Sequence, residues 1–340
     1  MKTTLKDIAD IANVSLSTVS RALNDSPLIK VETKAKIKEI AKELKFEFNA
    51  AARSLSSNKT GNIAVVYETH IDELGPSLYI NQLFVELRAV LEEVEFDAIV
   101  LEAINPKTGD SNIDRLLRQQ KVDAFIIVHD HIEKEVYENI KDSGIPFVQL
   151  HLLPRYVERE SVDYFFADNT KGGYIATEHL IHQGCKTILT ILPYPIDYEE
   201  FANRTLGYKN ALKKHNLEFK DEYIIPAEFS FSVGHEIFEK HLELINKADG
   251  IFFQTDIQAF AFLTIAKERG MSIPKDLKII GYDDSPLCKA ITPNLSTIKQ
   301  PKTKLAELAC ARVIDLINKK DLEVVSQTVV APELVIRQSS

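Results

Sequence analysis

The sequence predicts an α-helical headpiece of the helix-turn-helix type, followed by an α/β core built as two doubly wound parallel-sheet lobes. Three observations lead to this prediction. Three short amphipathic helical patterns fill residues 4–44, apolar runs alternate with helical stretches from residue 62 onward, and electric charge divides between these two parts. Because the repeated βα units are too many for one compact sheet, we expect two lobes with a cleft between them.

The charge distribution separates a basic head from an acidic body. The 340 residues carry 41 Lys and Arg against 50 Asp and Glu, a formal net charge of −9. Residues 1–60 contain 9 Lys and 2 Arg against 3 Asp and 4 Glu, a net charge of +4, which leaves −13 for the rest of the chain. This asymmetry suggests a module that binds a polyanion, joined to a part that does not.

Composition and motifs argue against several classes of protein. No apolar run approaches the roughly 20 residues of a membrane span, and residues 1–10 lack the apolar stretch of a signal peptide. The three cysteines, Cys185, Cys288 and Cys310, are far apart, which fits a reducing cytoplasm and gives no zinc spacing. The motifs of phosphate-binding loops, nucleophile elbows, zinc proteases and dinucleotide sites are also missing. We therefore expect a cytoplasmic protein that is not an enzyme and has no cofactor.

The headpiece begins with two short helices joined by a tight turn. Thr4 can cap the first helix, and Asp7 adds negative charge to its first turn. Asn13 can adopt the left-handed backbone that the turn needs, and Ser15 can cap the second helix. A third helix follows, with an apolar stripe that consists of Ile37, Ile40, Ala41 and Leu44. Two helices joined by a turn of about four residues and braced by a third form a helix-turn-helix unit.

The second helix keeps its outward face small and polar. Short hydroxyl and amide side chains let a helix approach base edges and phosphates closely, and Arg21 could contact guanine with two hydrogen bonds. For this pattern alone, an ordinary three-helix module with a solvated polar face is the favoured alternative. The outward residues are Ser17, Thr18, Ser20, Arg21 and Asn24.

Residues 4–9, 14–24 and 49–55 resemble the headpiece and hinge helix of the lactose-repressor (LacI/GalR) family of bacterial transcription regulators. The resemblance places Leu16, Ser17 and Arg21 at base-reading positions and Leu55 at the leucine that enters the central minor-groove step. An apolar wedge fits that role because partial unstacking bends the duplex. Asn49 and Ala52 accompany Leu55 in the hinge segment. Phosphate contacts are implied for Thr4, Ser15, Thr18, Ser20, Asn24 and Thr33.

The body shows a series of apolar runs that predict parallel strands, with helices between them. Its motifs at 168–180, 204–208, 281–284, 298–301 and 332–339 resemble the same family, whose core resembles type I periplasmic sugar-binding proteins. The expected strands are 63–67, 98–101, 124–128, 147–150, 162–166, 187–192, 251–253 and 278–282. The expected helices are 83–93, 113–120, 135–143, 171–183, 205–214, 234–245, 258–269 and 302–318.

The resemblance also implies the domain organisation. Residues 1–46 would form the helix-turn-helix headpiece, residues 47–60 the hinge helix and linker, and residues 61–340 the effector-binding core. Three chain crossings between the lobes are expected near 155–161, 288–293 and 320–324. They give an N-lobe of about 61–158 and 292–321 and a C-lobe of about 159–291 and 322–340.

The effector site follows from the same motifs. Arg204 matches the arginine that binds effector hydroxyls or a carboxylate, and Asp283 matches a cleft aspartate that accepts hydroxyl hydrogen bonds. Thr255 and Phe229 stand where the family has a polar and an aromatic pocket residue. Without the motif, Arg204 could equally form a structural ion pair. The residues 129–131, His-Asp-His, could bind a metal, but such tracts on loops are usually solvated, so no metal site is expected.

The resemblance implies a ligand-responsive regulator of a carbohydrate-use operon, acting as a repressor on double-stranded operator DNA. Twofold symmetry implies a homodimer on a pseudo-palindromic operator. The effector would be a sugar or glycoside, and no membrane partner is expected. The helix at 302–318 and the first-lobe helices are candidates for the dimer face. The alternatives are a periplasmic-type sugar-binding protein, or a regulator that answers to a non-sugar effector or to a protein co-regulator.

Overall fold

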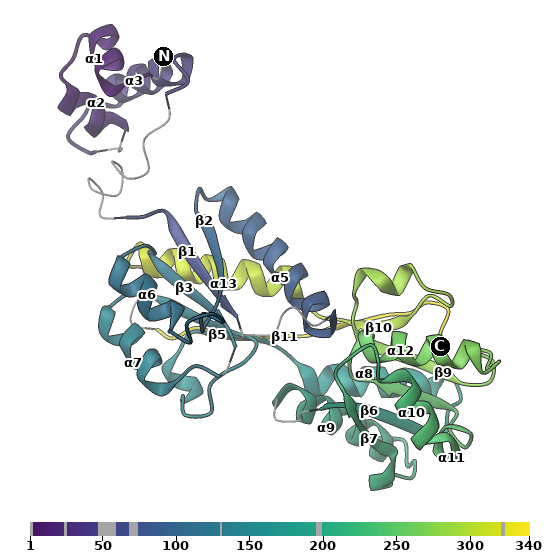
Figure 1. Cartoon of the computed structure of the whole chain (residues 1–340). Coiled ribbons are helices and arrows are strands. Elements are labelled where there is room, and N and C mark those ends of the chain that lie inside the picture. Colours follow the sequence, from purple (N-terminus) through teal and green to yellow (C-terminus); the bar gives the residue numbers. More distant parts are fainter. Residues whose placement is uncertain are drawn as a thin grey trace. The chain divides into compact units, whose positions relative to one another are not determined.

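The computed structural model describes residues 3–23, 26–46, 59–67, 74–129, 131–194, 199–320 and 324–340, with the side chains of 74–77 left out. The chain divides into two compact units, Met1–Gly61 and Asn62–Ser340 (Figure 1). The first is helical and the second contains two parallel sheets with helices on both faces. The predicted fold class is confirmed.

Local capping signals shape the first unit. It contains α1 (Leu5–Ala12), α2 (Leu16–Leu23) and α3 (Val31–Glu43). Thr4 and Asp7 form a reciprocal capping box at α1, and Asn13 ends that helix with a φ of 56°. The Ser15 hydroxyl accepts the Thr18 amide at 3.1 Å and so caps α2. The three apolar stripes meet in one small core, which contains Ile8, Ala12, Val19, Ala22, Ile37 and Ile40.

The first sheet of the second unit has the strand order β11-β5-β4-β3-β1-β2, and its described pairs are parallel. Helices α5 and α13 pack together against one face, and α6 and α7 against the other (Figure 1). The strands are β1 (Asn62–Tyr67), β2 (Asp97–Glu102), β3 (Ala124–Val128), β4 (Phe147–Leu150), β5 (Tyr164–Ala167) and β11 (Gln327–Val330). The helices are α5 (Leu74–Glu93), α6 (Asn112–Gln119), α7 (Lys134–Ser143) and α13 (Lys302–Ile317).

The second sheet has the order β12-β10-β9-β8-β6-β7, with β12 antiparallel at its edge. Helices α8 and α9 pack on one face and α10–α12 on the other. The strands are β6 (Ile188–Tyr194), β7 (Ile224–Glu228), β8 (Gly250–Phe253), β9 (Lys278–Asp283), β10 (Ser296–Lys299) and β12 (Glu333–Val335). The helices are α8 (Asn169–His182), α9 (Glu199–Lys214), α10 (Gly234–Lys240), α11 (Leu242–Ile245) and α12 (Asp256–Glu268).

The three chain crossings lie later in the sequence than predicted, so the expected crossings at 155–161, 288–293 and 320–324 are wrong. Strand β5 pairs with β4 in the first sheet, so the first crossing lies between β5 and α8. Strand β10 belongs to the second sheet, so the next crossing follows it at 300–301. The last crossing joins β11 to β12 at 331–332. Strand pairing decides lobe membership, and the short runs of β7, β10, β11 and β12 were not predicted as strands.

Two glycines let α8 and α9 approach closely. An ideal Cβ on Gly207 would lie 2.0 Å from the carbonyl oxygen of Thr170, and one on Gly173 would lie 2.0 Å from that of Arg204. Both clashes are with backbone atoms, which no side-chain rotation relieves. The two helices therefore cross with their backbones nearly in contact, and this brings α8 against the turn of α9 that carries Arg204.

We expect Gly207→Ala to lower the free energy of unfolding by about 1–3 kcal/mol or more, because its Cβ forces α8 and α9 apart. Asn210, exposed on α9, provides the control, and Asn210→Ala should change that free energy by only about 0.5 kcal/mol. Urea unfolding followed by circular dichroism measures both. Equal effects of the two substitutions would contradict the close-packing argument.

Candidate effector site and nucleic-acid interface

Arg204 is buried, with a side chain only 2% exposed, in the middle of α9. Its Nε donates to Asn169 Oδ1 at 2.9 Å, and its Nη1 donates to the carbonyl oxygen of Gln254 at 2.6 Å. The guanidinium carbon lies 3.8 Å from the centroid of the Tyr282 ring and 5.0 Å from that of Phe201. Within the described part of the chain, neutral acceptors and aromatic faces hold this cation in place, and no ion pair of Arg204 is found there.

Asp283 ends β9 with a φ of 121° and is half-buried. Gln300, which follows β10, donates its Nε2 to an Asp283 carboxylate oxygen at 2.7 Å, while Lys302 Nζ donates to the Asp283 carbonyl oxygen at 2.7 Å. Burial raises the pKa of Asp283, and Arg204 is the largest influence that opposes the rise. The two predicted polar residues therefore interact electrostatically at the C-terminal edge of the second sheet.

His151 and Tyr79 line the corresponding edge of the first sheet. The Tyr79 hydroxyl and His151 Nε2 lie 2.5 Å apart, in a hydrogen bond whose donor depends on the imidazole tautomer. Burial, followed by the positive charges of Arg204 and Lys302, lowers the pKa of His151 to about 3, so its ring is neutral. His151 Nδ1 lies 3.6 Å from Glu200 Oε1, which links this lobe to the first turn of α9.

Buried polar atoms that lack a hydrogen-bond partner among the described residues gather at the ends of parallel strands. Each such atom costs about 1–3 kcal/mol if it stays unpaired, so this edge is suited to a polar ligand that completes the hydrogen bonds. Ligands of open α/β sheets bind at this edge. Five of these atoms belong to residues in or just after β3, β4, β8 and β10: His129 Nε2, Gln149 Oε1, His151 Nδ1, Gln254 Oε1 and Gln300 Oε1.

The other two predicted effector residues are Thr255 and Phe229. Thr255 is buried, and its hydroxyl pairs with Gln258 Oε1 at 3.0 Å. Phe229 is half-buried, with its ring 6.0 Å from that of Phe201, which in turn faces Arg204. Phe229 thus joins the aromatic side of the site through Phe201, whereas the Thr255 hydroxyl is engaged within the second lobe.

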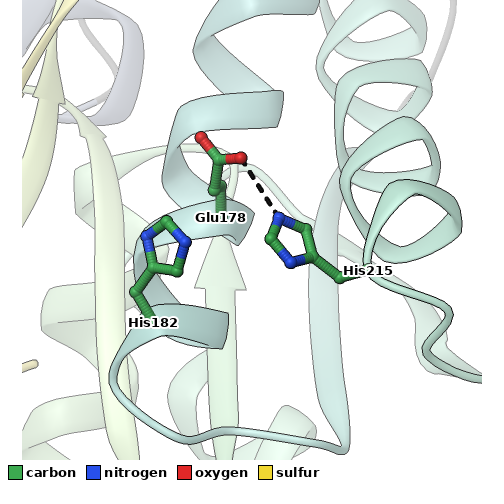
Figure 2. A group of neighbouring side chains, drawn as sticks. All are labelled: Glu178, His182 and His215. Carbon is green, nitrogen blue, oxygen red and sulfur yellow. Dashed lines mark hydrogen bonds and ion pairs between the residues drawn. The ribbon is translucent and has the colours of Figure 1, made fainter.

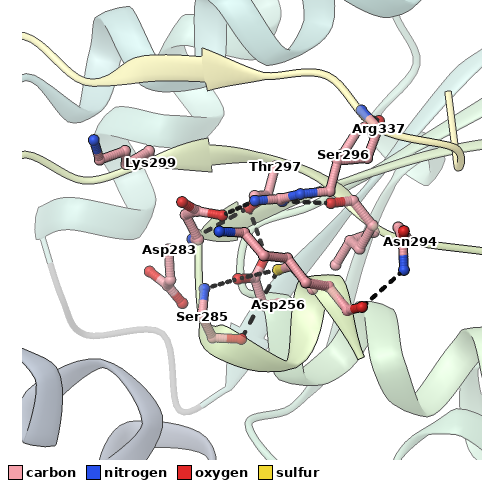
Figure 3. Close-up of polar contacts among 12 residues, drawn as sticks. Asp256, Asp283, Ser285, Asn294, Ser296, Thr297, Lys299 and Arg337 are labelled. Atoms are coloured by element: carbon pink, nitrogen blue, oxygen red, sulfur yellow. Dashed lines mark hydrogen bonds and ion pairs between the residues drawn. The ribbon is translucent and has the colours of Figure 1, made fainter. Parts of the chain in front are cut away.

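A buried carboxylate holds the elements around Asp283 together (Figure 3). Asp256, the first residue of α12, accepts hydrogen bonds from the Thr297 hydroxyl at 2.6 Å, the Ser285 amide at 2.8 Å and the Cys288 thiol at 3.1 Å. Burial, followed by the charge of Asp283, raises the pKa of Asp256 to about 7. Asp256 therefore connects α12 to β10 and to the segment between β9 and β10.

Several residues of this candidate site were not predicted from the sequence. Asn169 and Gln254 share one signal, because each is among the first polar residues after an apolar strand. Gln300 lacks this signal, because β10 before it has the sequence Ser-Thr-Ile-Lys. Tyr79 gives no such signal, since it lies within a helix. His129 is buried, and burial lowers its pKa to about 4, while its Nδ1 accepts the His131 amide at 3.2 Å. Asp130, the third member of that tract, lies outside the described residues.

The three residues predicted to read bases, Leu16, Ser17 and Arg21, lie on one face of α2. Leu16, Ser17 and Arg21 are exposed, whereas Val19 and Ala22 on the opposite side are buried. The Ser15 hydroxyl oxygen lies 2.8 Å from those of both Ser17 and Thr18. Ser20 and Thr33 are half-buried, and Thr4 is exposed. Asn24, Asn49, Ala52 and Leu55, together with the hinge segment, lie outside the described residues.

Comparison with known proteins gives matches for both units. Residues 4–49 match the family model for bacterial regulatory proteins of the lacI family, and residues 177–340 match that for the periplasmic binding protein-like domain. The chain is 29% identical over 324 residues to the probable HTH-type transcriptional repressor ExuR of Bacillus subtilis (strain 168), covering 94% of this chain and 92% of that protein.

Solved structures are similar along the whole chain. A LacI-family transcriptional regulator from Enterococcus faecium with bound ribose is 27% identical, with a TM-score of 0.70, over 82% of this chain and 98% of that one. The lac repressor dimer bound to operator and an anti-inducer has a TM-score of 0.75 over 100% of this chain and 99% of that one. At 19% identity the second likeness is one of fold alone.

A helix-turn-helix unit joined to a two-lobed core of this kind defines a DNA-binding transcriptional regulator rather than an enzyme. Residues 4–49 form a helix-turn-helix domain of the lacI type, residues 177–340 match a periplasmic binding protein-like domain, and the relatives of the chain are LacI-family regulators. In the part of the chain that the structure describes, no helix is long and apolar enough to cross a membrane.

Proposed function

We propose that this protein is a sugar-responsive repressor of a carbohydrate-use operon, which binds a pseudo-palindromic operator as a homodimer. The observation that carries the proposal is the set of buried, incompletely paired polar groups around Arg204 and Asp283. The exposed polar face of α2 supports the operator contact. Twofold symmetry of a dimer would place one headpiece on each half-site.

The types of these polar atoms favour a hydroxyl-rich effector. The side-chain carbonyl oxygens of Gln149, Gln254 and Gln300 need hydrogen-bond donors. A sugar hydroxyl both donates and accepts, so it can serve these oxygens and the guanidinium of Arg204. Carboxylate and phosphate groups accept hydrogen bonds and cannot supply the missing donors. The half-buried ring of Phe229, which packs against Phe201 beside Arg204, offers an apolar surface for the C–H faces of a sugar.

An effector at these strand ends could change the relative orientation of the lobes. Gln149 and His151 belong to the first lobe, while Arg204 and Gln254 belong to the second. A ligand that contacts residues of both lobes stabilises the lobe arrangement to which it binds more tightly. The size of this effect equals the difference between its binding free energies for the two arrangements. That arrangement would alter the spacing of the two headpieces in a dimer and so operator affinity.

The direct test combines operator selection with an effector screen on the full chain. Selection from a random duplex library should recover a pseudo-palindrome, and sedimentation should show a dimer. A panel of neutral sugars should contain one that raises the melting temperature by several degrees, since a ligand at 100 times its Kd stabilises by about 2.7 kcal/mol. That sugar should change the affinity for the selected duplex. Recovery of no symmetric sequence, or a response confined to non-sugar ligands, would contradict the proposal.

A further inference from the structure

Two imidazoles and a carboxylate meet outside the effector site, on the helices α8 and α9 of the second lobe (Figure 2). Glu178 and His182 stand one turn apart on α8, and His215 immediately follows the end of α9. One ligand atom from each residue lies within 4.8 Å of the other two. Glu178 and His215 are half-buried and His182 is exposed.

The geometry of the three groups is close to that of a metal site. His215 Nε2 lies 3.1 Å from Glu178 Oε1, and the rings of His182 and His215 are 5.5 Å apart at an interplanar angle of 85°. Tetrahedral Zn²⁺ with metal–ligand distances near 2.0–2.1 Å separates its ligand atoms by about 3.3 Å. Only His182 has to move closer, and its exposed side chain is free to turn about its χ angles. The residues therefore need a side-chain adjustment and no backbone change.

Two neighbouring groups besides His215 contact the Glu178 carboxylate. The Tyr174 hydroxyl donates a hydrogen bond to Glu178 Oε1 at 2.6 Å. Lys214 Nζ lies 3.4 Å from the same oxygen and makes an exposed ion pair with it. The Lys214 ammonium group competes with a metal ion for the Glu178 carboxylate. Removing this ammonium group should therefore tighten metal binding.

We propose that Glu178, His182 and His215 bind a divalent transition-metal ion, for which Zn²⁺ is the best match. Two neutral imidazoles and one carboxylate are ligands that Zn²⁺ commonly takes, and three protein ligands leave a fourth position for water. The ion would join the C-terminal part of α8 to the end of α9. Glu178 and His182 have the i, i+4 spacing that places two ligands on one face of a helix, and the crossing of the two helices adds His215.

The metal site is separate from the effector site, although both use α8 and α9. Asn169, which accepts from Arg204, begins α8, and Glu178 lies nine residues further along it. At 1.5 Å per residue this separation is about 14 Å along the helix axis. Zinc would therefore stabilise the helix pair without occupying the cleft, so the metal proposal does not depend on the proposed sugar response.

Zinc titration of the tag-free full chain against a competing chromophoric chelator tests the proposal. We expect one Zn²⁺ per chain, with at least tenfold weaker binding in both His182→Asn and His215→Asn. His235→Asn is the matched control, because His235 is exposed on α10 one turn before Glu239. The proposal would be overturned if the wild-type chain did not bind one Zn²⁺. It would also be overturned if the control lost as much zinc affinity as the two variants.

Two further measurements separate metal ligation from a structural role of these side chains. Lys214→Gln should tighten zinc binding, because it removes the competing ammonium from Glu178. Co²⁺ should give a visible absorption band that His182→Asn and His215→Asn change and His235→Asn does not. Circular dichroism verifies that the variants fold. An unchanged cobalt spectrum in folded His182→Asn and His215→Asn variants would show that these imidazoles are not ligands.

Discussion

Replacing Arg204 with alanine is expected to abolish the response to the effector sugar while operator binding by the free protein persists. Arg204 is only 2% exposed, and its guanidinium group supplies charged donors at the candidate effector site. Hydrogen bonds to charged groups are worth about 1.5–3 kcal/mol each. Losing two of them from a ligand therefore lowers its affinity by a factor of 10² or more. Fluorescence anisotropy measures the change in affinity for the DNA duplex that the sugar causes.

The controls for this prediction address stability and general charge. Arg204→Ala also leaves Asn169 Oδ1 and the Gln254 carbonyl oxygen without the Arg204 donors, so the melting temperature should fall. Arg269→Ala removes an exposed arginine that pairs with Glu239 at 3.1 Å, and its sugar response should equal that of the wild type. A folded Arg204→Ala protein with a normal sugar response would place the effector elsewhere.

Replacing Arg21 with alanine is expected to weaken binding to the selected operator by about 1–3 kcal/mol, which is roughly 5- to 150-fold. Arg21 is exposed on the outward face of α2, where its guanidinium can donate two hydrogen bonds to a guanine. Its neighbours Leu16 and Ser17 offer little hydrogen bonding, so much of the direct base readout rests on Arg21. The loss should be confined to one base pair per half-site.

Duplexes substituted at each position measure that specificity. The wild-type protein should discriminate at the position that Arg21 reads, and Arg21→Ala should not. Lys42→Ala, which removes an exposed cation from the last turn of α3, should leave the sequence preference intact. Binding should weaken with salt for every variant because phosphate contacts release counterions. Discrimination by Arg21→Ala equal to that of the wild type would remove the base-reading role.

The headpiece was predictable because its signals are local. The capping box of Thr4 and Asp7, the left-handed Asn13 and the Ser15 cap all act within one or two helical turns. The buried strands β1, β3 and β4 were predictable for a similar reason, since strands covered on both faces are continuously apolar. Strands β10, β11 and β12 are short, and only their partners in the sheet make them strands.

Some residues of the candidate effector site could be predicted from the sequence. Arg204 and Asp283 stand in motifs, and the structure brings their charges together. Tyr79 and His151 are 72 positions apart in the sequence, yet their side chains share a hydrogen bond. Thr255 has the expected position at the start of α12, but its hydroxyl pairs with Gln258. Such contacts depend on the order of the strands in the sheets, and local patterns in the sequence do not reveal this order.

The sequence by itself determined the class of this protein: a basic helix-turn-helix head and an acidic two-lobed core. Capping, hydrophobic period and charge are properties of neighbouring residues, so they can be read along the chain. Tertiary structure alone decided where the chain crosses between the lobes and which polar atoms at the strand ends stay without partners. It also decided that His215 meets Glu178 and His182. These features arise from packing between segments far apart in the sequence, such as the glycine-mediated crossing of α8 and α9.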